Sequence, residues 1–391
     1  MHVGLHTIWN HSLTTDALFA PAGRLSPFGV DRPFLMAVAE AIRARGGRIS
    51  LCDPQTAAAV DIIWVIDDLS PPLRRYRRAN PDARWVYWAR EPPVVIGHNG
   101  PASIPQLARH FDAVLHFHRP AGTYADPVIP MLHPWNDPSR IAGDAAAPPV
   151  EARCCNVSSN LTSDHPASMY AARRAVIRHF EREDPAAFAQ YGKYWPDGWA
   201  VTRGVTDDKL ATLRRYPFTL CFENQVGTTT YISEKIFDCF HAGSVPIYWG
   251  AEDVTDHIPQ AAFIDYRRLG SPAALADHLS TIDPATHAAM VDAGRRFARS
   301  DERFTPASGA ATVLGAFEAV LDGGDSAMTT AGLEELLAHA ARTEMNVRPY
   351  IALLPPAAKL RFVASHIRPA AAALSQNPAR VASYLRRYLG G

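Results

Sequence analysis

Residues 216–250 read YPFTLCFENQVGTTTYISEKIFDCFHAGSVPIYWG, and this stretch decides the fold of the chain. Its two continuously apolar runs, 218–222 and 245–249, are typical of strands covered on both faces of a sheet. We expect a glycine- and threonine-rich loop and then a short amphipathic helix between them, because apolar residues recur at i, i+4 and i+8 from Ile232. A strand, a helix and a second buried strand in this order predict a parallel sheet.

The start of this helix is a candidate anion-binding site. We expect Thr230 to be its N-cap and Gly243 its C′ residue. The polar residues at the strand's end and the helix's start are Glu223, Asn224, Glu234 and Lys235. In open α/β sheets such an edge binds phosphorylated ligands, because unpaired helix N–H groups and a lysine both favour negative charge. The alternative is a helix with an ordinary Glu–Lys face in solvent.

Alternating strand and helix patterns divide the chain into two expected Rossmann-like domains. In residues 1–148, short apolar runs alternate with helical patterns, and the clearest helix spans 33–47. A small, proline-bearing linker at 143–153 leads into a second alternating set, which fills 149–322. Neither set carries a GxGxxG turn, which argues against a dinucleotide-dependent oxidoreductase.

Composition is that of a soluble globular protein and gives no argument for a nucleic-acid partner. Of the 391 residues, 47% are hydrophobic and 20% are charged, and Lys+Arg and Asp+Glu both number 39. The five cysteines form neither a CxxC motif nor a paired framework, and the first residues show no secretion signal. We therefore expect a cytoplasmic protein.

Residues 323–391 are expected to form a helical, basic tail. No acidic residue follows Glu344, whereas seven cations do: Arg348, Lys359, Arg361, Arg368, Arg380, Arg386 and Arg387. Together with broken amphipathic stripes, this charge predicts peripheral contact with an anionic membrane surface, which places the protein at the inner membrane. The alternative is a set of helices packed on the body with a solvated basic face.

Residues 216–250 resemble the signature of the α-1,3/1,4-fucosyltransferases, glycosyltransferase family 10. FTLCFENQ, YISEKIFDCFHAGSVPIYWG and AAFIDY, within residues 218–266, match in order the family's FxxxFEN, Y-[IV]-[ST]-E-K, AGxVPxxxG and SFI-like elements. Among family members, the bacterial proteins without a membrane anchor have the most similar sequence features. One departure is visible, because the loop QVGTTT is about one residue longer than is usual in the family.

The resemblance implies an α/β fold of the GT-B type, in which two Rossmann-like domains face each other across a cleft. It implies a metal-independent, inverting transfer of L-fucose from GDP-fucose, with no cofactor, to a hydroxyl of a GlcNAc- or glucose-containing oligosaccharide or glycolipid. The residues that it places at the donor are Arg173, Glu223, Asn224, Tyr231, Glu234 and Lys235. Lys235 would neutralise the leaving diphosphate and Glu234 would bind fucose hydroxyls. Glu223 would hold the pocket or the ribose, or simply cap the strand's end.

The choice of Arg173 rests on spacing. In the family a Ser-Asn pair precedes an arginine that opens an amphipathic helix and contacts the diphosphate, and Ser159-Asn160 is followed here by Arg173 and Arg174. Apolar residues follow Arg173 at the family's spacing of three and seven positions, and a guanidinium can bind phosphate bidentately. The alternative is an arginine on the solvent face of its helix.

A general base is expected from the N-terminal domain, because inversion needs one group that deprotonates the attacking hydroxyl. The apolar strand 84–89 ends at Arg90-Glu91, and two prolines follow. Glu91 therefore lies at a strand's carboxyl end, where active residues of such sheets gather, and it matches a glutamate of bacterial family members. The alternative is an ordinary surface glutamate.

Two further side-chain classes bear on the site. Asp-x-Asp is absent, and no predicted helix carries HxxxH or HExxH, so no metal site is predicted. Trp195 and Trp199 are candidates for stacking on a sugar, because the C–H faces of sugars pack on aromatic rings. Two rival functions stay open: a related transferase that uses another nucleotide sugar, and a non-catalytic glycan- or nucleotide-binding protein on the same fold.

Overall fold

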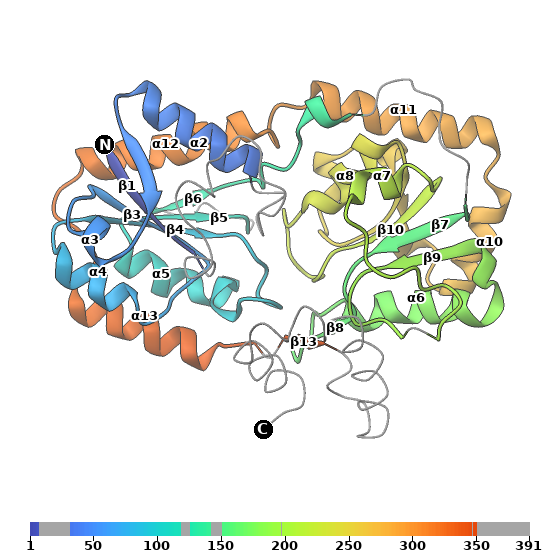
Figure 1. The fold of residues 1–391 in the computed structure, drawn as a ribbon, viewed down its shortest axis with the longest axis horizontal. Coiled ribbons are helices and arrows are strands. Elements are labelled where there is room, and N and C mark those ends of the chain that lie inside the picture. The colour runs from blue at the N-terminus through green and yellow to red at the C-terminus, as the bar shows by residue number, and fades with distance from the viewer. Residues whose placement is uncertain (8–31, 119–125, 142–150, 197, 346, 350–391) are drawn as a thin grey trace, which may run out of the picture.

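A computed structural model describes residues 1–7, 32–118, 126–141, 151–196, 198–345 and 347–349. These residues form two lobes, each built on a parallel β-sheet with helices on both faces (Figure 1). The N-terminal lobe lies at the left of the figure and the C-terminal lobe at the right. Strand and helix alternate in both lobes, as the sequence predicts.

The N-terminal lobe contains a six-stranded sheet of order β2-β1-β3-β4-β5-β6, in which all neighbours are parallel. Its strands are β1 (His2–Thr7), β2 (Arg48–Leu51), β3 (Ile62–Ile66), β4 (Arg84–Ala89), β5 (Ala113–His116) and β6 (Val128–Pro130). Its helices include α2 (Arg32–Ala44), α3 (Pro54–Ala57), α4 (Leu73–Ala79) and α5 (Ile104–His110). The order reverses between β1 and β3, so a switch point lies beside the carboxyl end of β3.

Large aromatic side chains make the centre of this lobe. Trp64 on β3 and Trp88 on β4 stack with ring centroids 6.1 Å apart, and Phe34 of α2 packs edge-on against Trp88 at 4.9 Å. All three side chains are buried. Because full burial of such a side chain stabilises the fold by roughly 2–3 kcal/mol, the WVYW run of β4 is core rather than a sugar platform.

The C-terminal lobe contains a five-stranded parallel sheet of order β12-β11-β10-β7-β9. Its strands are β7 (Cys154–Val157), β9 (Phe188–Tyr191), β10 (Phe218–Phe222), β11 (Val245–Trp249) and β12 (Ile264–Asp265). Its helices are α6 (Tyr170–Glu183), α7 (Lys209–Leu213), α8 (Glu234–Ala242), α9 (Val254–His257), α10 (Pro272–Thr281) and α11 (Pro284–Ser300). Here the order reverses between β7 and β10.

Helix α8 begins three residues later than the sequence suggests. Ser233, and not Thr230, is the N-cap, and its hydroxyl accepts from the Lys235 N–H. Thr230 is unsuited to the role because it has a positive φ of 62° and its N–H donates to Asp253. The predicted end is confirmed, since Gly243 follows the helix in the left-handed conformation with a φ of 79°.

The chain returns to the N-terminal lobe after α11. Helix α12 (Pro306–Asp322) packs against α2, β4 and β5, and α13 (Thr330–Arg342) packs against α4 and α5. Phe317 of α12 lies edge-on against Trp64, with 5.5 Å between ring centroids. The expected ranges 149–322 and 323–391 put these helices in the second domain and in a tail, but packing places both on the N-terminal sheet. Helical period alone does not show which sheet a helix covers.

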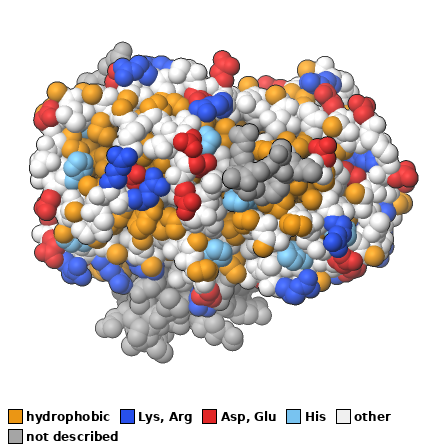
Figure 2. Space-filling view, turned by 180° about the vertical axis from the view of Figure 1, so that it is seen from behind, with side chains coloured by type: hydrophobic (Ala, Val, Ile, Leu, Met, Phe, Trp, Pro, Cys, Tyr) orange, Lys and Arg blue, Asp and Glu red, His pale blue; other side chains and the backbone are white. Residues whose placement is uncertain are grey.

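A short strand after α13 reaches the C-terminal lobe again. Strand β13 (Arg348–Pro349) pairs antiparallel with β8 (Leu161–Thr162). The prediction of membrane contact falls mainly on residues 350–391, which lie outside the described residues, and it stays a prediction. Among the described helices none is long and apolar enough to cross a membrane. On the face seen in Figure 2, basic and acidic side chains occur in small mixed groups, and neither sign covers it.

Candidate functional site

Glu223 anchors the N-terminus of α8. Its side chain is fully buried at the carboxyl end of β10 and accepts from the N–H and the hydroxyl of Ser233, at 2.8 and 2.7 Å. The same carboxylate accepts from Nζ of Lys235 at 3.1 Å. The contacts of the carboxylate all fix the first turn of α8, which favours the role of holding the pocket.

Lys235 and Glu234 are the partly exposed charged residues of this site. Lys235 is 19% and Glu234 23% exposed, and their charged atoms lie 3.8 Å apart. Burial opposes the charged form of Lys235, but Glu223 and Glu234 raise its pKa. Burial also opposes the ionised form of Glu234, but Lys235, Lys209 and a Ser233 hydrogen bond lower its pKa to about 2. Both side chains are therefore charged at neutral pH.

Lys209 is a member of the site that the sequence did not reveal. Its Nζ lies 2.8 Å from Oδ2 of the buried Asp238 and 3.5 Å from Oε1 of Glu234. Asp238 also pairs with Arg140 at 3.4 Å. Lys209 comes from α7, outside the motif, and only the i, i+4 spacing of Glu234 and Asp238 hinted that these two acids share a partner.

Arg173 and Arg174 take different surroundings, although both are buried. Arg173 reaches the end of β10, where it donates to the carbonyls of Phe222 and Glu223 at 2.6 and 3.0 Å and to Asn224 Oδ1 at 3.4 Å. Arg174 donates to Asn160 Oδ1 and to a neighbouring carbonyl at 3.1 and 2.7 Å. Arg173 is the one that lines a crevice together with Lys235 of α8, and its Nε is buried with no hydrogen-bond partner in the part of the chain that the structure describes.

Three cations from three helices line one narrow crevice at the switch point of the C-terminal sheet. Arg173, Lys209 and Lys235 surround a space of about 20 Å³ beside the ends of β7 and β10. Their charges repel, since Arg173 and Lys209 both lower the pKa of Lys235. Concentrated positive charge at a helix N-terminus stabilises a phosphate group.

Tyr231 lies at the junction of the lobes and contacts the N-terminal one. Its buried ring packs against Phe117 and His133, with centroids 5.2 and 5.6 Å apart. The Nε2 of His133 donates to the carbonyl of Arg90 at 2.9 Å, and burial lowers its pKa to about 4, so the ring is neutral at pH 7. Tyr231 thus connects the loop before α8 to the strand that precedes Glu91.

Glu91 lies two residues after the end of β4, within electrostatic range of Lys235 and Glu234 of α8. Its carboxylate is 28% exposed and accepts from Arg90 at 2.8 Å. Burial raises its pKa, Arg90 lowers it, and weaker electrostatic interactions with Lys235 and Glu234 oppose each other. The predicted base and the predicted donor residues are therefore within electrostatic range of one another, on opposite lobes.

Asp67 and Asn99 hold the Glu91 backbone, and the sequence did not single them out for this. Asp67 is buried with a positive φ of 60°, and it accepts from the N–H groups of Arg90 and Glu91 at 2.8 and 3.2 Å. Asn99 donates to Asp67 at 2.7 Å and to the Glu91 carbonyl at 2.8 Å. Strained backbone of this kind costs about 1–3 kcal/mol and is typical of functional sites.

One expectation about aromatic side chains turns out differently. Trp195 is core rather than a sugar platform, because it is buried and its Nε1 donates to the Ser158 carbonyl at 2.7 Å. Trp199 is half-buried beside it, with 6.1 Å between the ring centroids. Within the described ranges, no group of three His, Cys, Asp or Glu side chains is placed to hold a metal ion.

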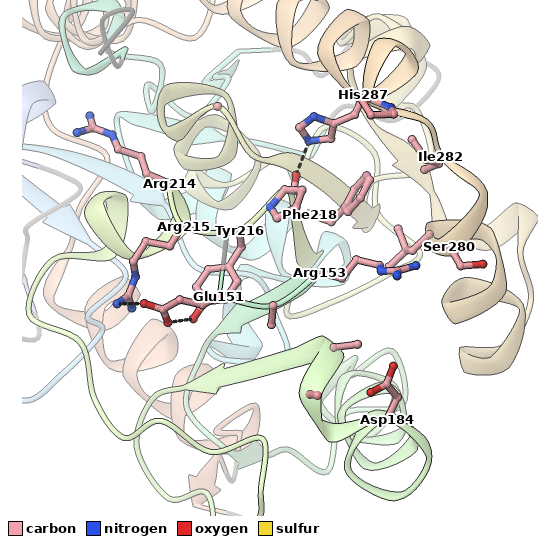
Figure 3. Close-up of a pocket in the computed structure, with 17 residues that line it drawn as sticks. Glu151, Arg153, Asp184, Arg214, Arg215, Tyr216, Phe218, Ser280, Ile282 and His287 are labelled. Atoms are coloured by element: carbon pink, nitrogen blue, oxygen red, sulfur yellow. Dashed lines mark hydrogen bonds and ion pairs between the residues drawn. The ribbon is translucent and has the colours of Figure 1, made fainter. Parts of the chain in front are cut away.

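A large cavity lies away from these residues. It measures about 770 Å³ and opens at the amino ends of β7 and β10, between Arg153, Asp184 and His287 (Figure 3). None of the predicted site residues lines it. Because active residues of parallel sheets gather at the carboxyl ends of strands, the crevice beside α8 is the stronger candidate.

Comparison with known proteins points to the same region. A family model described as "Glycosyltransferase family 10 (fucosyltransferase) C-term" matches residues 152–290. An alpha-(1,4)-fucosyltransferase of Arabidopsis thaliana is 36% identical over 83 residues, which are 21% of this chain and 20% of that protein. The 4-galactosyl-N-acetylglucosaminide 3-alpha-L-fucosyltransferase 9 of Bos taurus is 38% identical over 89 residues, which are 22% of this chain and 24% of that protein. The matched part thus spans less than a quarter of either relative.

Solved structures support the fold. A crystal structure of an alpha1,3-fucosyltransferase with GDP is similar with a TM-score of 0.50 at 13% identity, over 84% of this chain and 92% of that one. The crystal structure of Anabaena Alr3699/HepE in complex with UDP is similar with a TM-score of 0.54 at 10% identity, over 81% of this chain and 99% of that one. At such identities the likeness shows the fold alone, and it confirms the predicted GT-B arrangement. Through residues 152–290, the chain is similar to the C-terminal domain of glycosyltransferase family 10.

Proposed function

We propose that this protein is an inverting, metal-independent α-1,3-fucosyltransferase that moves L-fucose from GDP-fucose to a hydroxyl of a GlcNAc- or glucose-containing glycan. The main support for the proposal is that Glu91 of the N-terminal lobe lies within electrostatic range of Glu234 and Lys235 of the C-terminal lobe. A base on one lobe and an anion-binding helix N-terminus on the other are the two parts that a single displacement needs.

The donor diphosphate would lie against α8, with no cofactor. Lys235 and Arg173 supply positive charge at the crevice, and Lys209 adds a third cation beside it. These charges stabilise the leaving GDP most when its bond to fucose breaks, because negative charge then accumulates on the diphosphate. Fixed cations thus supply the neutralisation that a divalent metal gives in other transferases.

On the sugar side, Glu234 is suited to accept hydrogen bonds from fucose hydroxyls, because its pKa of about 2 keeps it ionised. Asn224 and Tyr231 close the ends of the same loop and complete the donor site. Glu223 acts indirectly, because its carboxylate accepts hydrogen bonds from Ser233 and Lys235.

Glu91 would act as the general base. Its carboxylate takes the proton of the acceptor hydroxyl while that oxygen bonds to the anomeric carbon, and the electron pair of the broken bond leaves on GDP. Attack from the face opposite to GDP inverts the anomeric centre. The raised pKa of Glu91 suits this step, because a more basic carboxylate removes a proton more readily.

The acceptor is proposed by class only, as an oligosaccharide or glycolipid. A glycolipid acceptor would agree with a cytoplasmic enzyme that touches the inner membrane through its basic C-terminal segment. Nucleic acid is not a proposed partner, since Lys+Arg and Asp+Glu balance at 39 each.

One assay tests the proposal. The full chain is incubated with GDP-fucose and either lactose or N-acetyllactosamine, with and without EDTA, and product and GDP are quantified. We expect an α-linked fucosyl product in both conditions. GDP-mannose and UDP-glucose are offered in parallel. Transfer from one of these and not from GDP-fucose would contradict GDP-fucose as the donor. Absence of product from all donors contradicts an enzymatic role, and complete loss with EDTA contradicts metal independence.

A further inference from the structure

We propose that Gln225 is a positioning residue that ties the loop carrying Glu91 to the donor side of the site. This inference rests on the proposed function, since it assigns Glu91 as the base. It concerns two segments. The Glu91 loop comprises residues 90–99 of the N-terminal lobe, and the bridging loop comprises residues 225–231 of the C-terminal lobe.

The contact is made on the backbone of Val94. Its N–H donates to Oε1 of Gln225 at 2.9 Å, and its carbonyl accepts from the hydroxyl of Ser163 at 2.9 Å. Val94 is fully buried and Gln225 is 3% exposed. Both backbone polar groups of one N-terminal residue are therefore bound by side chains of the C-terminal lobe.

Because Val94 lies close to Glu91 in the chain, this contact also constrains the Glu91 backbone. Pro92 and Pro93 have no N–H, so the Val94 N–H is the first main-chain donor after Glu91. The proline rings also fix two φ angles between Glu91 and Val94, which leaves a short, stiff segment. A displacement of Val94 is therefore passed on to the Glu91 backbone.

The bridging loop itself is fixed to both lobes. On its own lobe, the N–H of Val226 donates to the Ala167 carbonyl at 3.1 Å, directly after Gln225. At its other end, Tyr231 packs on Phe117 of the N-terminal lobe. Both ends of the loop thus contact the N-terminal lobe, and α8 with its charged residues begins three residues later. This is the loop that is longer here than the family pattern leads one to expect.

The far side of the Glu91 loop is also enclosed. A side chain at Gly97 would overlap the carbonyl of Thr343, which follows α13. The chain then continues into β13, which pairs with β8 of the C-terminal lobe. Asp67 and Asn99 hold the same loop from within its own lobe. Gln225 is the member of this set that connects the loop to the segment leading directly into α8.

Three variants of the full chain test the assignment. Gln225→Met keeps the volume but removes the acceptor, whereas Gln225→Glu keeps an oxygen that the Val94 N–H can reach. Gln106→Met is the matched control, because in the described ranges its amide donates to Glu335 within the N-terminal lobe. For each we measure kcat and KM, GDP affinity, and amide hydrogen exchange of the peptide 91–99 with and without GDP.

We expect Gln225→Met to lower kcat by about tenfold to a hundredfold, since a misplacement of roughly 1 Å has effects of that size. GDP affinity should stay within about twofold, because the donor cations are untouched. Exchange in 91–99 should rise and lose its response to GDP, and Gln225→Glu should recover most of the rate while Gln106→Met matches the wild type.

An unchanged kcat and unchanged exchange in Gln225→Met would overturn the proposal. A loss of GDP affinity equal to the loss of rate would make Gln225 a donor ligand instead, and equal damage in Gln225→Glu would point to packing. If the wild-type protein transfers no fucose, the proposed function fails, and the exchange of 91–99 still decides whether Gln225 holds the loop.

Discussion

The Nζ atom of Lys235 lies 3.1 Å from Oε2 of Glu223, a carboxylate with no exposed surface. The pair is therefore a buried anchor on one side and a partly exposed cation on the other. A lysine held in this way is already oriented before any ligand binds. Binding therefore costs less side-chain conformational entropy.

Replacing Glu223 should therefore damage both stability and binding. In Glu223→Ala, the N–H and hydroxyl of Ser233 and the ammonium of Lys235 lose their buried acceptor. We expect a loss of about 3–5 kcal/mol and a lower melting temperature, with a smaller loss in Glu223→Gln. Thermal unfolding of both variants measures this, and an unchanged melting temperature of Glu223→Ala would contradict the anchoring role.

Glu91→Gln should abolish transfer but leave GDP affinity within about twofold, because the amide cannot take a proton and the donor residues lie on the other lobe. In the wild type, kcat/KM should fall as the pH falls, because protonation of Glu91 removes the base. Since the pKa of Glu91 is raised above 4.5, this acid limb should lie above that value. Retained turnover in Glu91→Gln would refute its role as the base.

The two neighbouring arginines give a matched pair. Arg173→Lys should weaken GDP binding by roughly tenfold or more, because lysine cannot reproduce the forked contacts of a guanidinium. Arg174→Lys should leave GDP affinity within about twofold, because Arg174 faces Asn160 and not α8. Isothermal titration with GDP separates the two, and the reverse pattern would move the assignment to Arg174.

Glu234 should make stability depend on pH. Its pKa is lowered to about 2 from 4.5, so its interactions with Lys235 and Lys209 stabilise the fold above pH 4.5 and are lost as the pH falls through about 2. The contribution is at most about 3 kcal/mol. We expect Glu234→Gln to be less stable than the wild type at pH 7, with the difference shrinking toward pH 2. Urea unfolding across this range checks it, and a constant difference would argue against these ion pairs.

The sequence predicted those parts of the molecule whose structure is encoded locally. The apolar runs 218–222 and 245–249 are both strands, and their spacing around the helix predicted the parallel sheet and the charged N-terminus of α8. Gly243 was a recognisable stop because a left-handed C′ residue favours glycine. The FEN and SEK motifs then predicted a resemblance to the family, and the family model matches residues 152–290.

What the sequence did not reveal depends on contacts between distant segments. Lys209 approaches α8 only because α7 folds beside it, and Gln225 meets Val94 only when the two lobes come together. The N-cap was misplaced because the carboxylate of Glu223, ten residues earlier, fixes Ser233. Trp195 looked suitable for sugar stacking because hydrophobicity does not say whether a ring faces a ligand or the core.

The return of α12 and α13 to the N-terminal lobe means that this lobe is not encoded by one continuous segment. The half that would recognise the acceptor is completed by a segment that follows the whole donor half in the chain. A hybrid enzyme made by joining the first half of one relative to the second half of another would thus carry Phe317 against a foreign Trp64. Exchanging acceptor preference between relatives therefore requires two crossover points, one on each side of the donor half.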